Sequence, residues 1–225
     1  MSQQQPVSNQ PTADPTNQPA TQSVQTQPVA STRLTVPDLI SIGIFTALYF
    51  VCVCVATLIS TLVAGAGTIF LPAVAALICG PVFMLSVARV GKFGGITVMG
   101  VVIGLFLFVS GHFALSFAAS VVFPVAADLI ARAGRYKNKV GILISYVVFC
   151  YGLTGPILPL WFMKDAYVAS LQARGKDAAY IDALFSQISV GSFFLAMGAI
   201  LVFGLIGGWF GQRLLEKHFV KAGIV

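Results

Sequence analysis

Residues 39–64 read LISIGIFTALYFVCVCVATLISTLVA, a stretch without one charged side chain. An α-helix rises 1.5 Å per residue, so this stretch can cross the roughly 30 Å hydrocarbon core of a bilayer. Similar apolar runs recur along the 225-residue chain, which is 57% hydrophobic and only 9% charged. A soluble domain carries roughly a quarter charged residues. We therefore expect an all-α integral membrane protein.

Outward from this stretch, the apolar runs predict six transmembrane helices. Pro37 and Asp38 provide a proline and an acid, both typical of the first turn of a helix, and glycines separate the later runs. The expected helices cover residues 37–63, 69–90, 96–110, 113–131, 140–160 and 188–214. Together they form one transmembrane domain over residues 37–225.

The first 36 residues have a different composition. They are rich in Gln, Pro, Thr, Ser and Asn and contain no aromatic residue. Such a segment cannot bury enough apolar surface to offset the entropy lost on ordering, so residues 1–36 are expected to form a disordered polar tail. A solvated tether is the simpler interpretation, and a docking tail for a partner protein is the alternative.

The distribution of basic residues predicts the orientation of the six helices. With both termini in the cytoplasm, ten Lys and Arg residues lie inside and three outside, as the positive-inside rule requires. The inside set is Arg33, Arg89, Lys92, Arg132, Arg135, Lys137, Lys139, Arg213, Lys217 and Lys221, and the outside set is Lys164, Arg174 and Lys176.

The connection between the fifth and sixth expected helices, residues 161–187, is the only long one. Asp177 is suited to cap a short helix. Four apolar residues share one face of that helix: Tyr180, Ile181, Leu184 and Phe185. We interpret this connection as a partly helical lid or an interfacial segment.

No motif for catalysis stands out. The chain has no nucleotide-binding Gly-x-x-x-x-Gly-Lys-Ser/Thr run, no His-Glu-x-x-His metal motif and no Gly-x-Ser-x-Gly elbow. Few acids and bases fall within the expected spans, so we expect neither an enzyme nor a cofactor or metal bound to this chain, and no nucleic acid as a partner. The cysteines are all inside apolar runs and are interpreted as core filler: Cys52, Cys54, Cys79 and Cys150.

One acid lies close to a membrane span. Asp128 and Arg132 are four residues apart, a spacing that allows a pair on one helix face. We expect a structural ion pair, with a role in contacting a partner as the alternative.

Small residues recur four apart in the first expected helix. Gly43 and Ala47 form one such pair, and Ala56, Ser60 and Ala64 continue the pattern. Small residues at this spacing allow two helices to approach closely in a membrane. The spacing alone leaves two interpretations open, contact with a partner helix or internal packing.

The end of the fifth expected helix combines two prolines and two glycines between residues 151 and 160. Irregular backbone at membrane depth requires protein or a wet cavity to satisfy its polar groups. We therefore expect an outward-facing pocket here, although Trp161 also suits an interfacial anchor. The candidate substrate-binding residues are His112, Tyr151, Thr154, Trp161, Lys164, Asp165, Gln187 and Ser189.

Four stretches carry a family resemblance. They read DLISIGIFTALYF at residues 38–50, ADLIARAGRYK at 127–137, LPLWFMKDAY at 158–167 and KHFVKAGI at 217–224. On these stretches the chain resembles the substrate-binding S components of energy-coupling factor (ECF) transporters, specifically the MptD or Trep-Strep family. The resemblance covers nearly everything after the tail.

The resemblance implies a six-helix protein of the bacterial cell membrane that captures a small molecule outside. A transmembrane coupling protein and two ABC ATPases, which use the ATP, would then drive its release inside. S components typically carry Ala-x-x-x-Ala early in the first helix, where they contact the coupling protein. Gly43 and Ala47 occupy the matching place, with Gly for Ala as a departure.

The expected cargo is a small organic, vitamin-like metabolite, because the sequence clusters no His or carboxylate ligands for a metal. Two other classes of protein remain as alternatives. An autonomous secondary transporter would need an ion-coupling site near the membrane midplane, and no acid is present at that depth. A membrane enzyme or scaffold is the other alternative.

Overall fold

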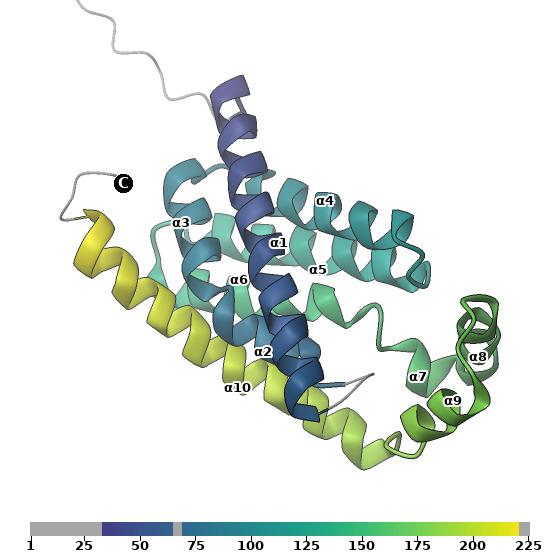
Figure 1. Ribbon diagram of the computed structural model, residues 1–225. Coiled ribbons are helices and arrows are strands. Elements are labelled where there is room, and N and C mark those ends of the chain that lie inside the picture. The colour runs from purple at the N-terminus through teal and green to yellow at the C-terminus, as the bar shows by residue number, and fades with distance from the viewer. Residues whose placement is uncertain (1–32, 65–68, 221–225) are drawn as a thin grey trace, which may run out of the picture. The chain divides into compact units, whose positions relative to one another are not determined.

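The computed structural model describes residues 33–64 and 69–220, which contain helices and no strand (Figure 1). The expected disorder of residues 1–36 falls almost wholly outside this part. The helices are α1 (Val36–Ala64), α2 (Leu71–Ile78), α3 (Gly80–Val90), α4 (Gly95–Val109), α5 (Leu115–Ala133), α6 (Lys139–Cys150), α7 (Pro159–Phe162), α8 (Lys164–Ala173), α9 (Ala178–Phe185) and α10 (Val190–Leu214). A 3-10 turn, Tyr151–Thr154, follows α6, and a π-helical segment, Leu215–Val220, follows α10.

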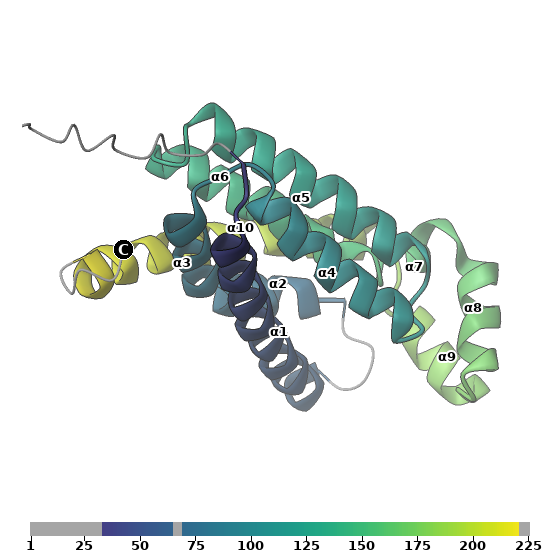
Figure 2. The ribbon, with the colours of Figure 1, turned by 90° about the horizontal axis from the view of Figure 1, so that it is seen from above.

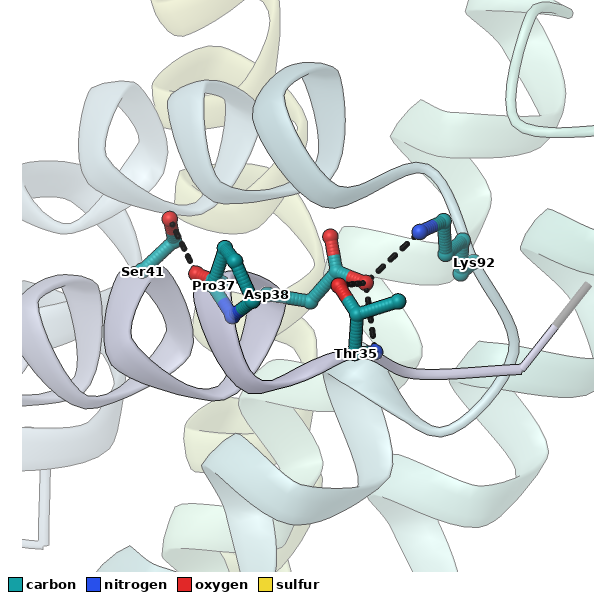
Figure 3. A network of polar contacts seen from close by, with 5 residues as sticks. All are labelled: Thr35, Pro37, Asp38, Ser41 and Lys92. Atoms are coloured by element: carbon teal, nitrogen blue, oxygen red, sulfur yellow. Dashed lines mark hydrogen bonds and ion pairs between the residues drawn. The ribbon is translucent and has the colours of Figure 1, made fainter. Parts of the chain in front are cut away.

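The start of α1 is fixed by one carboxylate, as Figure 3 shows. The backbone N–H and the hydroxyl of Thr35 both donate to Asp38 Oδ2, each at 2.7 Å. Lys92, in the turn before α4, adds an ion pair to the same oxygen at 2.6 Å. The expected helix start at Pro37 and Asp38 is confirmed, and the ion pair ties it to a distant turn.

The segment expected as one helix over residues 69–90 is instead broken into α2 and α3, which are bent by 54° at Cys79. Pro81 causes the break, because it has no N–H to donate to the carbonyl of Leu77. The carbonyl of Ala76, beside the break, accepts a hydrogen bond from the Tyr146 hydroxyl at 2.6 Å. A side chain of α6 thereby supplies a hydrogen bond at the bend.

Helix α10 packs along this break through glycines (Figure 1). A Cβ on Gly207 would lie 2.3 Å from the carbonyl oxygen of Ala76, and one on Gly80 would lie 2.0 Å from the carbonyl oxygen of Gly207. A Cβ on Gly211 would lie 2.7 Å from the carbonyl group of Gly80. The two backbones therefore touch, which is how helices associate in lipid without a hydrophobic driving force.

Helices α4 and α5 lie side by side in both views (Figures 1 and 2). Gly100 faces Pro124, and Gly104 faces Ser120, at distances that leave no room for a Cβ. Pro124 lies inside α5. The glycines of α4 accept its ring, so the proline contributes to helix packing.

Aromatic rings fill the core between α1, α3 and α6. Tyr49 meets Phe149 edge-on with ring centroids 5.4 Å apart, and Phe83 lies 5.1 Å from Phe149 and 4.9 Å from Tyr146. All four side chains are buried. This core holds α1 from one side only, and much of the opposite side of α1 is exposed.

The fifth expected helix, residues 140–160, ends ten residues early. Helix α6 stops at Cys150, continues as the 3-10 turn and gives way to the single turn of α7. Pro156 and Pro159 cannot extend the helical ladder, and a Cβ on Gly155 would lie 2.4 Å from the Cα of Ser116. The irregular backbone is therefore packed against α5.

The connection at residues 161–187 is largely helical, as expected. The Asp177 carboxylate accepts a hydrogen bond from the backbone N–H of Tyr180 at 2.8 Å and caps α9, which confirms its expected role. An apolar cluster lies beneath α7, α8 and α9 and is formed by Ile69, Leu160, Leu171, Ile181, Leu184 and Ala196.

Ion pairs and apolar contacts define two ends of the helical part. The basic end joins the start of α1, the α3–α4 turn, the α5–α6 turn and the end of α10, through Lys92 with Asp38 and Lys139 with Glu216. The other end holds the α4–α5 turn and α7–α9, and we call it the α7–α9 end. Nine described cations belong to the basic end and three to the α7–α9 end, while Lys221 lies outside the described residues.

Three described helices are long and apolar enough to cross a membrane, within Val36–Leu62, Leu115–Ala133 and Val190–Lys217. The bent pair α2 and α3 makes a fourth if it counts as one span. The two remaining expected spans correspond to shorter apolar helices, Gly95–Val109 and Lys139–Thr154.

Candidate functional site

The polar side-chain groups of three expected pocket residues donate hydrogen bonds to backbone carbonyls. The Tyr151 hydroxyl donates to the Met197 carbonyl on α10 at 2.9 Å. The Thr154 hydroxyl donates to the carbonyl of Tyr151, and Trp161 Nε1 donates to the carbonyl of Ser189 at 3.0 Å. These contacts tie the irregular backbone after α6 to α10, and they bring Trp161 and Ser189 together.

The four polar candidates on α8 and before α10 differ in the contacts that their side chains make. The Lys164 ammonium lies 5.0 Å from the centre of the Phe185 ring. Ser189 caps α10 through a reciprocal pair of hydrogen bonds with Ser192. Asp165 and Gln187 are exposed, and in the described part of the chain their side chains make no hydrogen bond.

His112 lies in the turn between α4 and α5, with Nδ1 3.2 Å from the carbonyl of Leu107. Burial lowers the pKa of His112, the Leu107 carbonyl opposes this shift, and the nearby charge of Arg174 adds to it. The neighbouring Phe113 ring lies 6.4 Å from that of Tyr167 on α8. The turn therefore contacts the α7–α9 end, and its imidazole is largely neutral at pH 7.

Six of the eight candidates thus belong to the α7–α9 end, whereas Tyr151 and Thr154 lie in the 3-10 turn after α6, where Tyr151 packs against the larger apolar core. Most serve as hydrogen-bond partners that hold this end together. The charged or amide groups of Lys164, Asp165 and Gln187 are exposed and make no hydrogen bond within the described part of the chain.

A second feature lies on α1, where an apolar groove of about 250 Å³ runs between α1 and α4. It is lined by Gly43, Thr46, Ala47, Phe50, Val102, Ile103 and Phe106. Gly43 and Ala47 are exposed, and a Cβ on Gly43 would meet no heavy atom within 4 Å.

The small residues of α1 therefore divide into two groups. Ala56 and Ser60 are buried, in agreement with internal packing, whereas Gly43 and Ala47 face outward. The side chain of Ala64 lies outside the described part. The structure thus assigns a different environment to each half of a pattern that looked uniform in the sequence.

The expected ion pair between Asp128 and Arg132 does not form. The buried Asp128 carboxylate instead accepts from the backbone N–H groups of Gly94 and Thr97 at 2.8 and 3.1 Å. The hydroxyls of Thr97 and Tyr136 donate to it at 2.9 and 2.6 Å.

This carboxylate caps the N-terminus of α4, where backbone N–H groups lack helical partners. Burial raises the pKa of Tyr136, and its hydrogen bond to Asp128 adds to this shift. Arg132 lies over the Phe93 ring at 4.9 Å. Asp128 is therefore a buried structural acid that links α4, α5 and the turn before α6.

Sequence reasoning missed the glycines of α10 and α4, although their signal was present. Gly204 and Gly208, Gly207 and Gly211, and Gly100 and Gly104 are each four residues apart. This is the spacing used to single out Gly43 and Ala47. In the structure all of these glycines except Gly204 lie against a neighbouring helix at distances that leave no room for a Cβ, so they are structural.

The helices and their exposed apolar faces define an all-helical integral membrane protein. The sequence profile of the Trep_Strep family, described as hypothetical bacterial integral membrane proteins, matches residues 36–221. The chain belongs to this family. No curated protein and no solved structure matches it.

Proposed function

We propose that the chain is the substrate-binding S component of an ECF-type ABC importer, with six transmembrane helices in the bacterial cell membrane. It captures a small organic, vitamin-like metabolite outside and releases it inside, with no catalysis of its own. A transmembrane coupling protein and two ABC ATPases, which use the ATP, complete the transporter.

The observation that carries this proposal is the open face of α1. Gly43 and Ala47 line an apolar groove of about 250 Å³, and residues of α4 form its other wall. Small residues at the surface of a membrane helix permit close approach of another helix. In this proposal a helix of the coupling protein occupies the groove, which matches what the family resemblance implies for these two positions.

The separation of charge supports the orientation in this proposal. Nine described cations at the basic end, against three at the α7–α9 end, fit a cytoplasmic basic end and cytoplasmic termini. The α7–α9 end then faces outward. Two of the six proposed spans, α4 and α6, are short for a bilayer and contact longer helices on their flanks.

Cargo capture in this proposal takes place at the outward α7–α9 end. Lys164, Asp165 and Gln187 offer one cation, one anion and one amide beside an apolar cluster. A metabolite with an apolar body and polar edges suits this mixture. The helices α7–α9 act as its lid and have to move, because side chains fill the space beneath them.

The test is assembly and uptake by a tagged chain in its native membrane. The double variant Gly43→Leu/Ala47→Leu fills the groove, so it should lose the coupling protein and ATPases on purification, and lose uptake. Cargo binding by the purified chain should stay nearly unchanged. Gly198→Leu is the matched control, because a Cβ on Gly198 also meets nothing within 4 Å.

Two results would contradict the proposal. Normal assembly and uptake in the double variant would remove α1 as the coupling surface. Uptake that persists when the associated ATPases are disabled, by a chain that purifies alone in several mild detergents, would establish an autonomous transporter instead.

A further inference from the structure

An exposed apolar stripe on α10 ends at a cation. The stripe consists of side chains 40–51% exposed, namely Val202, Leu205, Ile206 and Trp209. Their spacing of three and four residues places them on one face of the helix. Arg213 follows one turn later, with its guanidinium carbon 4.6 Å from the centre of the Trp209 ring.

The order of residues along this stripe matches the layers of a lipid leaflet. Apolar side chains suit the acyl region, an indole prefers the boundary of that region, and a guanidinium reaches the headgroup phosphates. Trp209 is 51% exposed, so its stacking with Arg213 takes place at the protein surface. The pair presents a cation where the acyl region ends.

The acids of the basic end leave most of its cations unneutralised. Asp38 is taken by Lys92, and Glu216 by Lys139 at 2.5 Å. Asp128 is fully buried and its oxygens accept four hydrogen bonds from backbone and hydroxyl donors. Among the described residues, the exposed cations at this end without an acid partner are Arg89, Arg132, Arg135, Lys137, Arg213 and Lys217.

A second guanidinium repeats the arrangement at the α5–α6 turn. Arg132 lies over the Phe93 ring at 4.9 Å, and Phe93 is 41% exposed. Arg135 and Lys137 follow in the turn, which is held by the hydrogen bond from Tyr136 to Asp128. The turn therefore keeps several cations at the same end as Arg213.

We propose that the basic end binds the headgroup phosphates of anionic phospholipids, with Arg213 over Trp209 as its main contact. The chemical partner is a phosphodiester at the surface of a leaflet, because the exposed apolar stripe of α10 continues directly from the cation. An acidic soluble protein would match the charge but would leave that stripe without a role. Clusters of cations at the ends of membrane helices generally attract anionic headgroups.

The test measures phospholipid retention by the purified full-length chain. The protein is exchanged into mild detergent with equal amounts of phosphatidylglycerol and phosphatidylcholine, and bound lipid is counted by native mass spectrometry. The wild-type chain should retain phosphatidylglycerol preferentially. The double variant Arg213→Gln/Lys217→Gln should lower that affinity by about fivefold for each cation removed.

A matched control removes two cations from the other end. Lys164→Gln/Lys176→Gln removes two ammonium groups that lie over the rings of Phe185 and Tyr180, and it should leave the preference unchanged. Inorganic phosphate at the same concentration should not displace the lipid. Equal loss in both double variants, or displacement by inorganic phosphate, would overturn the proposal.

One measurement needs no variant and covers the case of poor folding by the glutamine double variant. Retention of phosphatidylglycerol by the wild-type chain should fall as salt is raised, because exposed charges are screened. Retention that ignores salt, or equal retention of phosphatidylcholine, would also overturn the proposal.

Discussion

Helices α1 and α10 are both long and apolar, with small residues four apart, but the pair Gly207 and Gly211 on α10 and the pair Gly43 and Ala47 on α1 lie in opposite environments. On α10, Gly207 and Gly211 press against the backbone around the α2–α3 break. On α1, a Cβ on Gly43 would find open space. The same spacing is therefore filled internally at Gly207 and Gly211 and left open at Gly43 and Ala47.

This difference shows what small residues at helical spacing can and cannot indicate. They permit close approach, but the identity of the approaching helix depends on the rest of the fold. Where the chain fills the contact itself, a larger side chain should destroy the fold. Where the contact is open, the same change should affect only assembly with another protein.

The largest effect is expected for Gly207→Leu. Its Cβ would lie 2.3 Å from the carbonyl oxygen of Ala76, and backbone on both sides cannot move away cheaply. We expect at least about 4 kcal/mol of destabilisation, measured by unfolding in mixed detergent micelles. Gly198→Leu, on the open side of the same helix, should stay within about 0.5 kcal/mol. Equal tolerance of both changes would remove the contrast between the two helices.

A second large effect is expected at Asp128, which links α5 to α4 through hydrogen bonds from the start of α4. Asp128→Ala leaves the backbone N–H groups of Gly94 and Thr97 without an acceptor, and it should lower the free energy of unfolding by about 3 kcal/mol. Asp128→Asn keeps an acceptor and should cost about 1 kcal/mol. The same unfolding titration compares the two. If instead Arg132→Gln matched the alanine variant, the ion pair expected from the sequence would be the correct description.

The outcome at Asp128 illustrates the limit of reasoning from spacing. Residues four apart on one helix can meet, and Arg132 was the nearest opposite charge in the sequence. The Tyr136 hydroxyl lies eight residues away, but the two backbone donors lie 31 and 34 residues away, where the start of α4 has N–H groups without helical partners. Only the packing of α4 on α5 brings them together.

Local signals predicted more of the fold than of the site. The start of α1 and the Asp177 cap each depend on a few neighbouring residues, and both are confirmed. Pro81 is present in the sequence, but the apolar run around it predicts one continuous helix over residues 69–90. For Tyr151 and Trp161, the carbonyls that accept their hydrogen bonds belong to α10 and its start.

A smaller effect is expected for Tyr146→Phe, which tests the α2–α3 break without changing any helix contact by volume. The carbonyl of Ala76 loses its hydroxyl donor in a buried setting, which should cost about 1–2 kcal/mol. The unfolding titration again measures it. No measurable loss would mean that the bend is maintained by Pro81 and the α10 glycines alone.

The smallest effect on stability is expected at the exposed groove of α1. Gly43→Leu/Ala47→Leu places two large apolar side chains at an exposed groove, where neither needs to displace a neighbour. Leu is also a better helix former than Gly, so the purified chain should unfold within about 0.5 kcal/mol of the wild type. The same titration used for Gly207→Leu provides the comparison. A loss of several kcal/mol would show that α1 closes against its own chain at this groove, and Gly43 would then belong with the glycines of α10.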